Sequence, residues 1–447
     1  MGAGALILPR GLAAASSEKN PDSEKSHESV KSTETFKGNV LIIGAGAAGL
    51  HAAWLLNKQG VNVTVLEASS VYGGRIRSLD NFSEFPIELG ADKIYGKKSM
   101  LYDLVKKANA KFAPTKGEPY YALDGYVNTE AQLEEDADFK AAIGIRDTLA
   151  EYSGPNMTLD QFASRQGLKK RILPLFNALL ANPYGASLKQ IGIKPLIESE
   201  SRSDASVMQG TTMLSLLTEK YRSILDKIKL NSPVVSVEHF KDSIHVTDKS
   251  GTVYSADKVL ITVPLAVLKA NDIKFLPVLH ISKTSAFEKI GTGPGLRVLL
   301  KFSKRFWKDD STSIYSPGPV PEFVVTGPVR NNVLTATVYG EGAALLSGMG
   351  EGASAEVLKQ LDKIYGGNVA TRTVTGSTIL DWTKEPFIKG GISYPSLDSA
   401  GMREIAAASI DKKLYFAGEA MNTSGRFGTI HGAIETAQTA VDEMLKL

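Results

Sequence analysis

Three glycines and one acidic residue in the first quarter of the chain have the spacing of a phosphate-binding turn. Gly44, Gly46 and Gly49 form a G-x-G-x-x-G sequence, and Glu67 follows Gly49 by 18 residues. Such a turn lets backbone N–H groups approach a diphosphate, and an acid about 20 residues later can accept hydrogen bonds from ribose hydroxyls. A helix that starts at the turn adds partial positive charge. The pattern predicts a dinucleotide site, against the alternative of a glycine-rich turn without a ligand.

Two strands and one helix are expected to hold this turn in place. The run Val40–Ile43 is short, apolar and β-branched, as in a buried parallel strand. Leu50–Gln59 then predicts a helix that stops at Gly60, and Val61–Leu66 predicts a second strand that ends at the acidic residue. Together these segments form one βαβ unit around the glycine turn.

A second glycine turn after this unit carries an arginine. Gly73, Gly74 and Arg75 complete the run E-A-x-x-x-x-G-G-R, which starts at Glu67 and Ala68. Adjacent glycines allow close backbone contact with a ligand, and a guanidinium matches a phosphate. The run resembles the flavin-containing amine oxidase family, the superfamily of monoamine and polyamine oxidases. The resemblance implies that the arginine contacts an FAD phosphate and that the glycines lie near the flavin.

The resemblance continues in order through about 400 residues. Similar segments are ELGA at Glu88–Gly96 (with Lys93 where tryptophan is common), Leu230–Val237, Ala256–Leu265, Phe302–Trp307, Tyr415–Glu419 and Gly428–Glu435. The cofactor-binding residues implied are Gly44, Gly46, Ala48, Gly49, Glu67, Ala68, Gly73, Gly74, Arg75, Gly90, Ala91, Asp92, Val234, Trp382, Gly418, Glu419, Thr429 and Ile430. Some members attach FAD through a cysteine, but this chain has no cysteine and carries Ile392 at the nearest position. We therefore expect noncovalent FAD.

The resemblance also implies the reaction. A hydride leaves the carbon next to an amine nitrogen for flavin N5, the imine hydrolyses, and O₂ reoxidises the flavin to give H₂O₂. Four residues are expected at the catalytic positions: Arg297, Ser393, Tyr394 and Thr429. Arg297 stands where the family usually has a lysine, and an arginine stays charged, so a proton relay there is in doubt. Monoamine oxidases frame the amine with two aromatic rings. Here Ser393, with Tyr394 next to it, aligns with the first ring, and Thr429 aligns with the second. Thr429 with His431 is more similar to polyamine oxidases and histone demethylases.

An α/β fold follows from the same resemblance. We expect an FAD-binding doubly wound domain, Rossmann-like and of the glutathione-reductase type, with an interleaved α+β substrate domain. The FAD domain is placed at 38–96, 205–290 and 405–447, and the substrate domain at 97–204 and 291–404. Residues 97–204 are expected to be largely helical, whereas 291–404 should mix strands with two helices.

Composition excludes several classes of protein. With 447 residues and 43% hydrophobic content, the chain can build a large core. Its formal net charge of +3 gives no electrostatic reason to expect a nucleic-acid partner. The absence of cysteine excludes disulfides and thiol chemistry, and 6 scattered histidines argue against a metal centre. No apolar run approaches the roughly 18 residues of a membrane span. The partners expected are a small amine and O₂.

The first 37 residues are expected to lie outside the folded body. Met1–Ser16 are small and apolar and end in an alanine run, as in the second half of a secretory leader, although a plain tail is an equal alternative. Ser16–Lys37 are polar and mixed in charge, which indicates a disordered linker. A leader would place the protein in the periplasm or otherwise outside the cell, and without one it would be cytoplasmic.

Two other functions stay open at this point. Arg297 and the missing aromatic pair suit an FAD enzyme that oxidises C–C bonds, similar to desaturases and protoporphyrinogen oxidases. The same two departures also suit a flavoprotein with little turnover. The C-terminal motif and the stretch from Trp382 to Phe387 fit amine oxidases better.

Overall fold

The protein is described by a computed structural model that covers residues 35–202, 205–327 and 331–446. Residues Phe36–Leu447 form one compact unit. The expected leader and most of the expected linker lie outside the described residues.

A five-stranded parallel sheet forms the frame of the nucleotide-binding half. Its order is β10 (Ile228–Lys229), β2 (Asn62–Leu66), β1 (Asn39–Ile43), β14 (Lys258–Ile261) and β23 (Leu414–Phe416), and every neighbouring pair is parallel. The strands come from chain segments that are far apart in the sequence. β1 and β2 confirm the two predicted strands, and α1 (Ala47–Lys58) confirms the helix between them.

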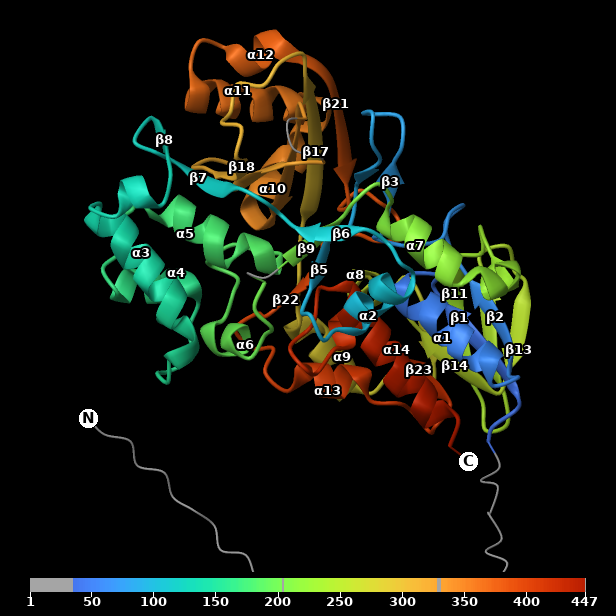
Figure 1. Cartoon of the computed structure of the whole chain (residues 1–447). Helices are drawn as coiled ribbons and strands as arrows, with labels where there is room; N and C mark the ends of the chain where they lie inside the picture. Colours follow the sequence, from blue (N-terminus) through green and yellow to red (C-terminus); the bar gives the residue numbers. More distant parts are fainter. Residues whose placement is uncertain (1–34, 203–204, 328–330, 447) are drawn as a thin grey trace, which may run out of the picture. The chain divides into compact units, whose positions relative to one another are not determined.

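Both faces of this sheet are buried, one by helices alone and the other by a second sheet together with helices. On one face, α1 packs against α14 (Ile430–Met444), with α2 (Met100–Lys107) and α7 (Met213–Lys220) in the same core. On the other face lie a four-stranded sheet and three helices (Figure 1). The sheet has the order β13 (Val253–Ala256), β12 (Ile244–Asp248), β11 (Val234–His239) and β15 (Lys274–Leu276). The helices are α8 (Leu265–Lys269), α9 (Ile281–Lys289) and α13 (Met402–Ala407).

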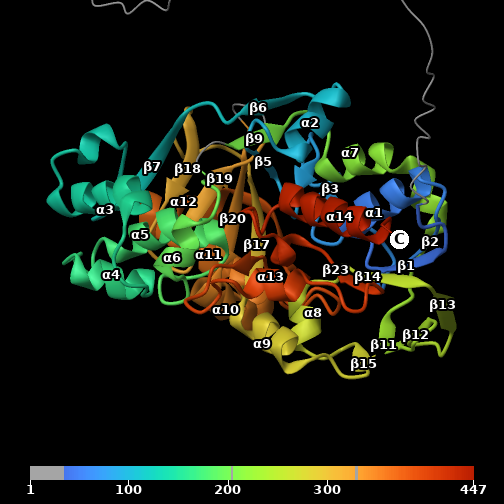
Figure 2. The same ribbon diagram turned by 90° about the horizontal axis from the view of Figure 1, so that it is seen from below.

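A seven-stranded sheet forms the second half of the body. Its order is β21 (Val374–Asp381), β17 (Gly295–Phe302), β20 (Val333–Tyr339), β19 (Glu322–Val325), β18 (Ser311–Tyr315), β7 (Glu118–Leu123) and β8 (Tyr126–Asn128). Alternate residues of β17 and β20 enter a core with α10 (Gly340–Met349), α11 (Ala353–Tyr365) and α12 (Val369–Thr373). The helices α3 (Ala137–Thr148), α4 (Leu159–Arg165), α5 (Leu173–Leu180) and α6 (Ile193–Ile197) form a separate core beside β7 (Figure 2).

Short strands complete the body. β5 (Lys93–Tyr95), β9 (Ala205–Met208) and β6 (Phe112–Pro114) form one small sheet. β3 (Ser78–Leu79) pairs with β4 (Ile87–Glu88), and β16 (Gly291–Thr292) pairs with β22 (Ser393–Tyr394).

The α/β fold class is confirmed, and two local expectations differ from the structure. Residues 97–204 contain the expected helices but also β6, β7 and β8, because Glu118–Leu123 extends the seven-stranded sheet by pairing with β18. Residues 291–404 contain three helices, α10–α12, and the start of α13, rather than two.

Among the described residues, none of the helices combines the length and the apolar composition needed to cross a membrane. Across the same three ranges, no group of three or more His, Cys, Asp or Glu side chains is placed to hold a metal ion.

Candidate active site

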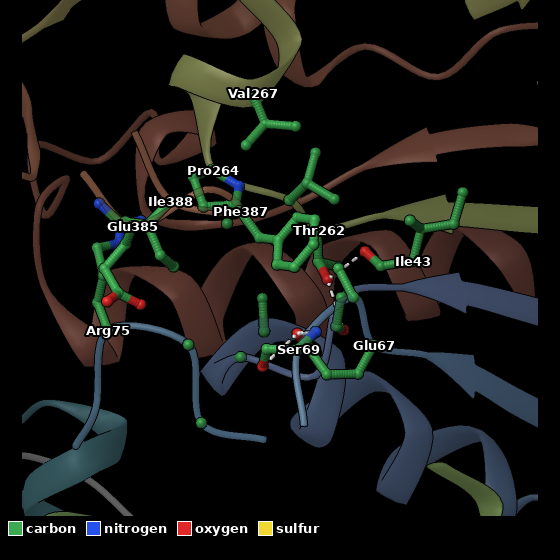
Figure 3. A pocket seen from close by; sticks show the side chains of 18 of the residues that line it. Ile43, Glu67, Ser69, Arg75, Thr262, Pro264, Val267, Glu385, Phe387 and Ile388 are labelled. Carbon is green, nitrogen blue, oxygen red and sulfur yellow. Dashed lines mark hydrogen bonds between the residues drawn. The ribbon is translucent and has the colours of Figure 1, made fainter. Parts of the chain in front are cut away.

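A cavity of about 630 Å³, the first cavity, lies at the carboxyl ends of the parallel strands. Ile43 and Leu66 close its floor where β1 and β2 end, and Thr262 follows the end of β14. Ligands bind in this position in open parallel α/β sheets. Figure 3 shows the turns and side chains that surround it, with Thr262 donating a hydrogen bond to the carbonyl of Ile43 at 2.9 Å.

The glycine turn leaves room for a ligand at the start of α1. Gly44 has φ +104°, which favours glycine, and a Cβ on Gly49 would lie 1.9 Å from the Gly44 carbonyl oxygen. By contrast, a Cβ on Gly46 would meet nothing within 4 Å, so the space beside it is open. Gly46 is also the N-cap of α1 and provides no side-chain cap, so free N–H groups face this space.

Glu67 lies in the wall of the first cavity and is almost fully buried. Its Oε2 accepts the Ala45 N–H at 2.7 Å, and its Oε1 accepts the Ser69 N–H at 2.9 Å and the Ser69 hydroxyl at 3.1 Å. These bonds fix the carboxylate between the glycine turn and the second turn, as Figure 3 shows for Ser69. A carboxylate has about four acceptor sites, so it retains capacity for a ribose hydroxyl.

Arg75 and Glu419, which both line the first cavity, form an ion pair. Arg75 Nη1 donates to Glu419 Oε1 at 2.9 Å and to the Gly391 carbonyl at 2.7 Å. Glu419 Oε2 accepts the N–H of Gly428 at 2.7 Å. Burial opposes ionisation, but the Arg75 guanidinium and the Ser393 hydroxyl hold the pKa of Glu419 below its ordinary value. The Glu419 carboxylate therefore stays charged and links the segments that carry Arg75, Ser393 and Gly428.

Ser393 and Tyr394 are not placed as the sequence predicts. Neither residue is among those lining the first cavity or the second cavity described below. The Ser393 hydroxyl is buried, donates to Glu419 Oε2 at 2.6 Å, and accepts from Arg403 Nη1 at 3.0 Å. The hydroxyl of Tyr394, also buried, accepts from Gln190 at 3.3 Å. The expected contact with a substrate is therefore replaced by a supporting network, in which Arg403 had no sequence signal.

Thr429 is the N-cap of α14 and lines both cavities. Its hydroxyl accepts the Gly432 N–H at 3.0 Å and donates to the Arg426 carbonyl at 2.6 Å. The hydroxyl is thus used in capping the helix rather than free to act on a substrate. The helix confirms the predicted start near His431, whose Nε2 lies 2.8 Å from Glu200 Oε2.

A second cavity of about 690 Å³ lies against the seven-stranded sheet. Its lining includes side chains from one face of that sheet, among them Arg297, Thr337, Tyr339, Glu322 and Tyr315. The two cavities share the lining residues Arg75, Ala91, Ile392, Gly428, Thr429 and Ile430. They therefore meet at one junction, between the second glycine turn and the start of α14.

Arg297 is buried on β17 and held in place by two oxygens. Nη1 donates to the Glu88 carbonyl at 2.9 Å, and Nη2 lies 3.2 Å from Asp92 Oδ2. The side-chain carboxyl of Glu88 takes no part in this contact, and burial raises the pKa of that carboxyl to about 8. The arginine is thus an ion-paired wall residue of the second cavity.

The other predicted cofactor residues divide between the two cavities. The first cavity is lined by Gly44, Gly46, Ala48, Glu67, Ala68, Gly73, Gly74, Arg75, Ala91, Val234, Gly418, Glu419, Thr429 and Ile430. Gly90, Asp92 and Trp382 line the second cavity, and Gly49 lies behind the turn against Gly44. Sequence reasoning missed Thr262 and the loop Glu385–Ile388, which covers the first cavity; Arg77 holds this loop by an ion pair of 2.8 Å to Glu385.

The geometry fits the expected FAD. The first cavity offers open space at an uncapped helix N-terminus for the diphosphate, and Glu67 lies at the end away from Arg75, a residue of the junction (Figure 3). With adenosine at that end, the redox-active ring would be held where the cavities meet.

Comparisons with known proteins agree with this geometry. A family model described as flavin containing amine oxidoreductase matches residues 47–210 and 134–445. "Lysine-specific histone demethylase 1B" of Mus musculus is 27% identical over 424 residues, covering 86% of this chain and 50% of that protein. The chain thus spans about half the length of this relative. "Polyamine oxidase 4" of Oryza sativa subsp. japonica is 27% identical over 446 residues, covering 91% of this chain and 88% of that protein.

Solved structures show the same fold. The structure of cyclohexylamine oxidase from Brevibacterium oxydans IH-35A superposes with a TM-score of 0.76 at 20% identity, covering 92% of this chain and 99% of that one.

Proposed function

The chain belongs to the flavin-containing amine oxidoreductase family, and from that premise we propose that it is an amine oxidase that holds FAD noncovalently in the first cavity and its amine in the second. The observation that carries the proposal is the junction of the two cavities at Ala91, Ile392, Thr429 and Ile430. A ligand that fills the first cavity meets a ligand of the second only there.

FAD supplies the hydride acceptor, flavin N5, and its reoxidation by O₂ yields H₂O₂. The absence of cysteine means that no cysteinyl bond to the cofactor can form. The residues of this chain would bind and orient the group. Free N–H groups of the glycine turn would bind the diphosphate, Glu67 would accept a hydrogen bond from the ribose, and Arg75 is held in place by Glu419.

The start of α14 is the second element that we assign to the cofactor. Its N-terminus, capped by Thr429, lies at the junction and carries the partial positive charge of a 15-residue helix. Negative charge that builds on the adjacent ring is stabilised by such a helix end.

The second cavity would desolvate and orient the amine. Trp382 and Leu296 contribute apolar surface to its wall, which favours the neutral form of an amine that must give up a hydride. Hydride is removed from the carbon next to nitrogen, the resulting imine takes up water, and an aldehyde or keto product and an amine or ammonia leave.

Peroxide release over a panel of amines tests this proposal. We expect purified protein to contain one FAD per chain and to produce H₂O₂ in proportion to the amine consumed. A protein that holds FAD but releases no peroxide with any amine would contradict it. Oxidation of polyene or porphyrinogen substrates alone would instead support the alternative of C–C oxidation, which the family match and the relatives do not favour.

A further inference from the structure

One wall of the first cavity is a short loop, Glu385–Lys389, which we call the strap. It belongs to the connection between β21 and β22, and its residues from Glu385 to Ile388 line the cavity on the side opposite Ser69 (Figure 3). Ile388 is almost fully buried, whereas Phe387 lines the cavity and is 38% exposed to solvent. The strap is therefore a single layer between the cavity and solvent.

Backbone hydrogen bonds fix the base of the strap. The N–H of Trp382 donates to the Gly295 carbonyl at 3.0 Å, and the N–H of Gly391 donates to the Gly293 carbonyl at 2.9 Å. The N–H of Gly390 donates to the Trp382 carbonyl at 2.9 Å and closes the neck of the loop. The two ends of the strap are thus held together, and the residues between them can move as a unit about this neck.

Within the strap the backbone hydrogen bonds are local. The N–H groups of Ile388 and Lys389 both donate to the Glu385 carbonyl, at 3.0 and 2.9 Å. Among the described residues, no backbone hydrogen bond joins Glu385–Lys389 to another part of the body. Lys389 has φ +62°, a left-handed conformation that persists in a residue other than glycine only where the surroundings hold it. The position of the strap therefore depends on its side chains.

Two ion pairs, which we call the latches, hold the ends of the strap to different walls of the cavity. Arg77 Nη1 lies 2.8 Å from Glu385 Oε2. At the other end, Lys389 Nζ lies 2.7 Å from Asp272 Oδ2. Arg77 follows the second glycine turn, and Asp272 lies between α8 and β15; both residues line the first cavity. The strap thus crosses from one wall to another with one latch at each end.

Both latches are partly open to solvent. The four side chains that form them are between 23% and 36% exposed. Ion pairs in such surroundings stabilise a structure weakly and are screened by salt. Each latch can therefore break while the rest of the body stays folded, and both must break before the strap can swing away from the cavity.

We propose that the strap is the gate through which FAD enters and leaves the first cavity, and that the latches Arg77–Glu385 and Asp272–Lys389 hold this gate closed. The inference rests on the proposed function, which places FAD in that cavity. The chain has no cysteine, so no cysteinyl bond retains the cofactor. The rate at which FAD leaves then depends on how often both latches are open together.

Exchange of the cofactor measures the gate without turnover. The holoenzyme is incubated with an excess of isotopically labelled FAD, and the bound FAD is analysed by mass spectrometry at intervals. Glu385→Gln and Lys389→Gln each remove one latch, so we expect each to speed exchange by up to about fivefold. The double variant should exchange faster than either single variant. High salt should speed exchange in the wild type and have less effect on the double variant.

Two controls separate the latches from a general change of charge. Lys274→Gln removes an exposed cation two residues from Asp272 and breaks neither latch, so exchange should stay at the wild-type rate. Lys389→Asp alone should speed exchange. Lys389→Asp combined with Asp272→Lys restores the latch with reversed charges and should bring the rate back toward that of the wild type.

A cleavable cross-link across one latch gives the decisive test. Because the chain has no cysteine, Asp272→Cys with Lys389→Cys provides the only two thiols, which a bis(methanethiosulfonate) reagent joins. We expect the cross-linked holoenzyme to exchange FAD more slowly, by roughly tenfold or more, than the same protein after cleavage with dithiothreitol, because opening of the strap is blocked. Equal rates before and after cleavage would overturn the gate, and so would unchanged exchange in both single variants and in the double variant.

The outcomes also separate the gate from the proposed function. Exchange that ignores the latches and the cross-link, in a holoenzyme that releases peroxide with amines, would overturn the gate and leave the proposed function intact. Exchange that depends on the latches, in a holoenzyme that releases no peroxide with any amine, would overturn the proposed function and leave the gate intact.

Discussion

The two cavities are built in different ways. The first cavity is made largely from backbone: two glycine turns, the uncapped start of α1 and the start of α14. The second cavity is made from side chains that come from β5, from one face of the seven-stranded sheet and from the helical region. Backbone sites depend on short contiguous motifs, whereas side-chain sites depend on how distant strands pair.

This difference explains where each kind of substitution should act. In the first cavity a single methyl group can prevent folding or exclude the ligand, depending on which glycine receives it. In the second cavity the same change should alter which molecule binds and how fast it reacts. The following predictions test that contrast.

The largest effect is expected in the glycine turn. Gly49→Ala places a Cβ 1.9 Å from the Gly44 carbonyl oxygen, so we expect a loss of about 3 kcal/mol or more and little folded protein. Gly46→Ala adds the same group where nothing lies within 4 Å, so the chain should fold normally and lose FAD affinity. Chemical denaturation and FAD content of the purified proteins measure both. Equal stability of the two variants would contradict the close packing at Gly49.

Glu419 should be the most important side chain for stability at the first cavity. Glu419→Gln leaves the half-buried Arg75 without its ion-pair partner and removes the negative charge that stabilises the buried Arg403, at an expected cost of about 3 kcal/mol. Because the folded pKa lies below the ordinary 4.5, the carboxylate stabilises the fold above that pH and loses this effect as pH falls through the folded pKa. The gap between wild type and variant, followed by denaturation from pH 7 to 3, should therefore shrink in acid. A constant gap would contradict the account.

Arg297 should affect the rate of flavin reoxidation rather than folding. The family usually has a lysine here, and a lysine can take part in proton transfer where an arginine remains charged. We expect Arg297→Lys to speed reoxidation by O₂ by roughly one order of magnitude. Stopped-flow mixing of the reduced enzyme with O₂ measures this, with FAD content as the control. Unchanged or slower reoxidation at full FAD content would argue against Arg297 facing the ring.

Ser393 should give the smallest effect. Ser393→Ala removes the bonds to Glu419 and Arg403 behind the cavity wall, so we expect a stability loss of about 1 kcal/mol and an unchanged rate of flavin reduction. A large loss of rate with unchanged stability would restore the catalytic role that the sequence predicts.

The sequence predicts the first cavity well because its elements are local. The βαβ unit needs only the pattern from Val40 to Glu67, and β1, α1 and β2 lie there within a few residues of the expected bounds. The start of α14 likewise follows from the contiguous segment Gly428–Glu435. In each case the residues that determine the element are close together in the sequence.

The second cavity was predicted poorly because its neighbours are set by strand register. Tyr315 and Glu322 meet because β18 pairs with β19, and Tyr121 joins them because β7 pairs with β18. Residues 97–204 are expected from the sequence to be largely helical, which does not predict the strands β6, β7 and β8 within them. Ser393 and Thr429 align with substrate-framing positions of the family, yet their hydroxyls are engaged with Glu419 and with the first turn of α14.

Anaerobic mixing of the purified holoenzyme with amines tests the central claim, that a ligand in the second cavity meets FAD at the junction. We predict that the flavin absorbance of the bound cofactor bleaches at a rate that rises with amine concentration and then saturates. Protein that holds one FAD per chain and is bleached by dithionite, but by no amine in the panel, would contradict the account.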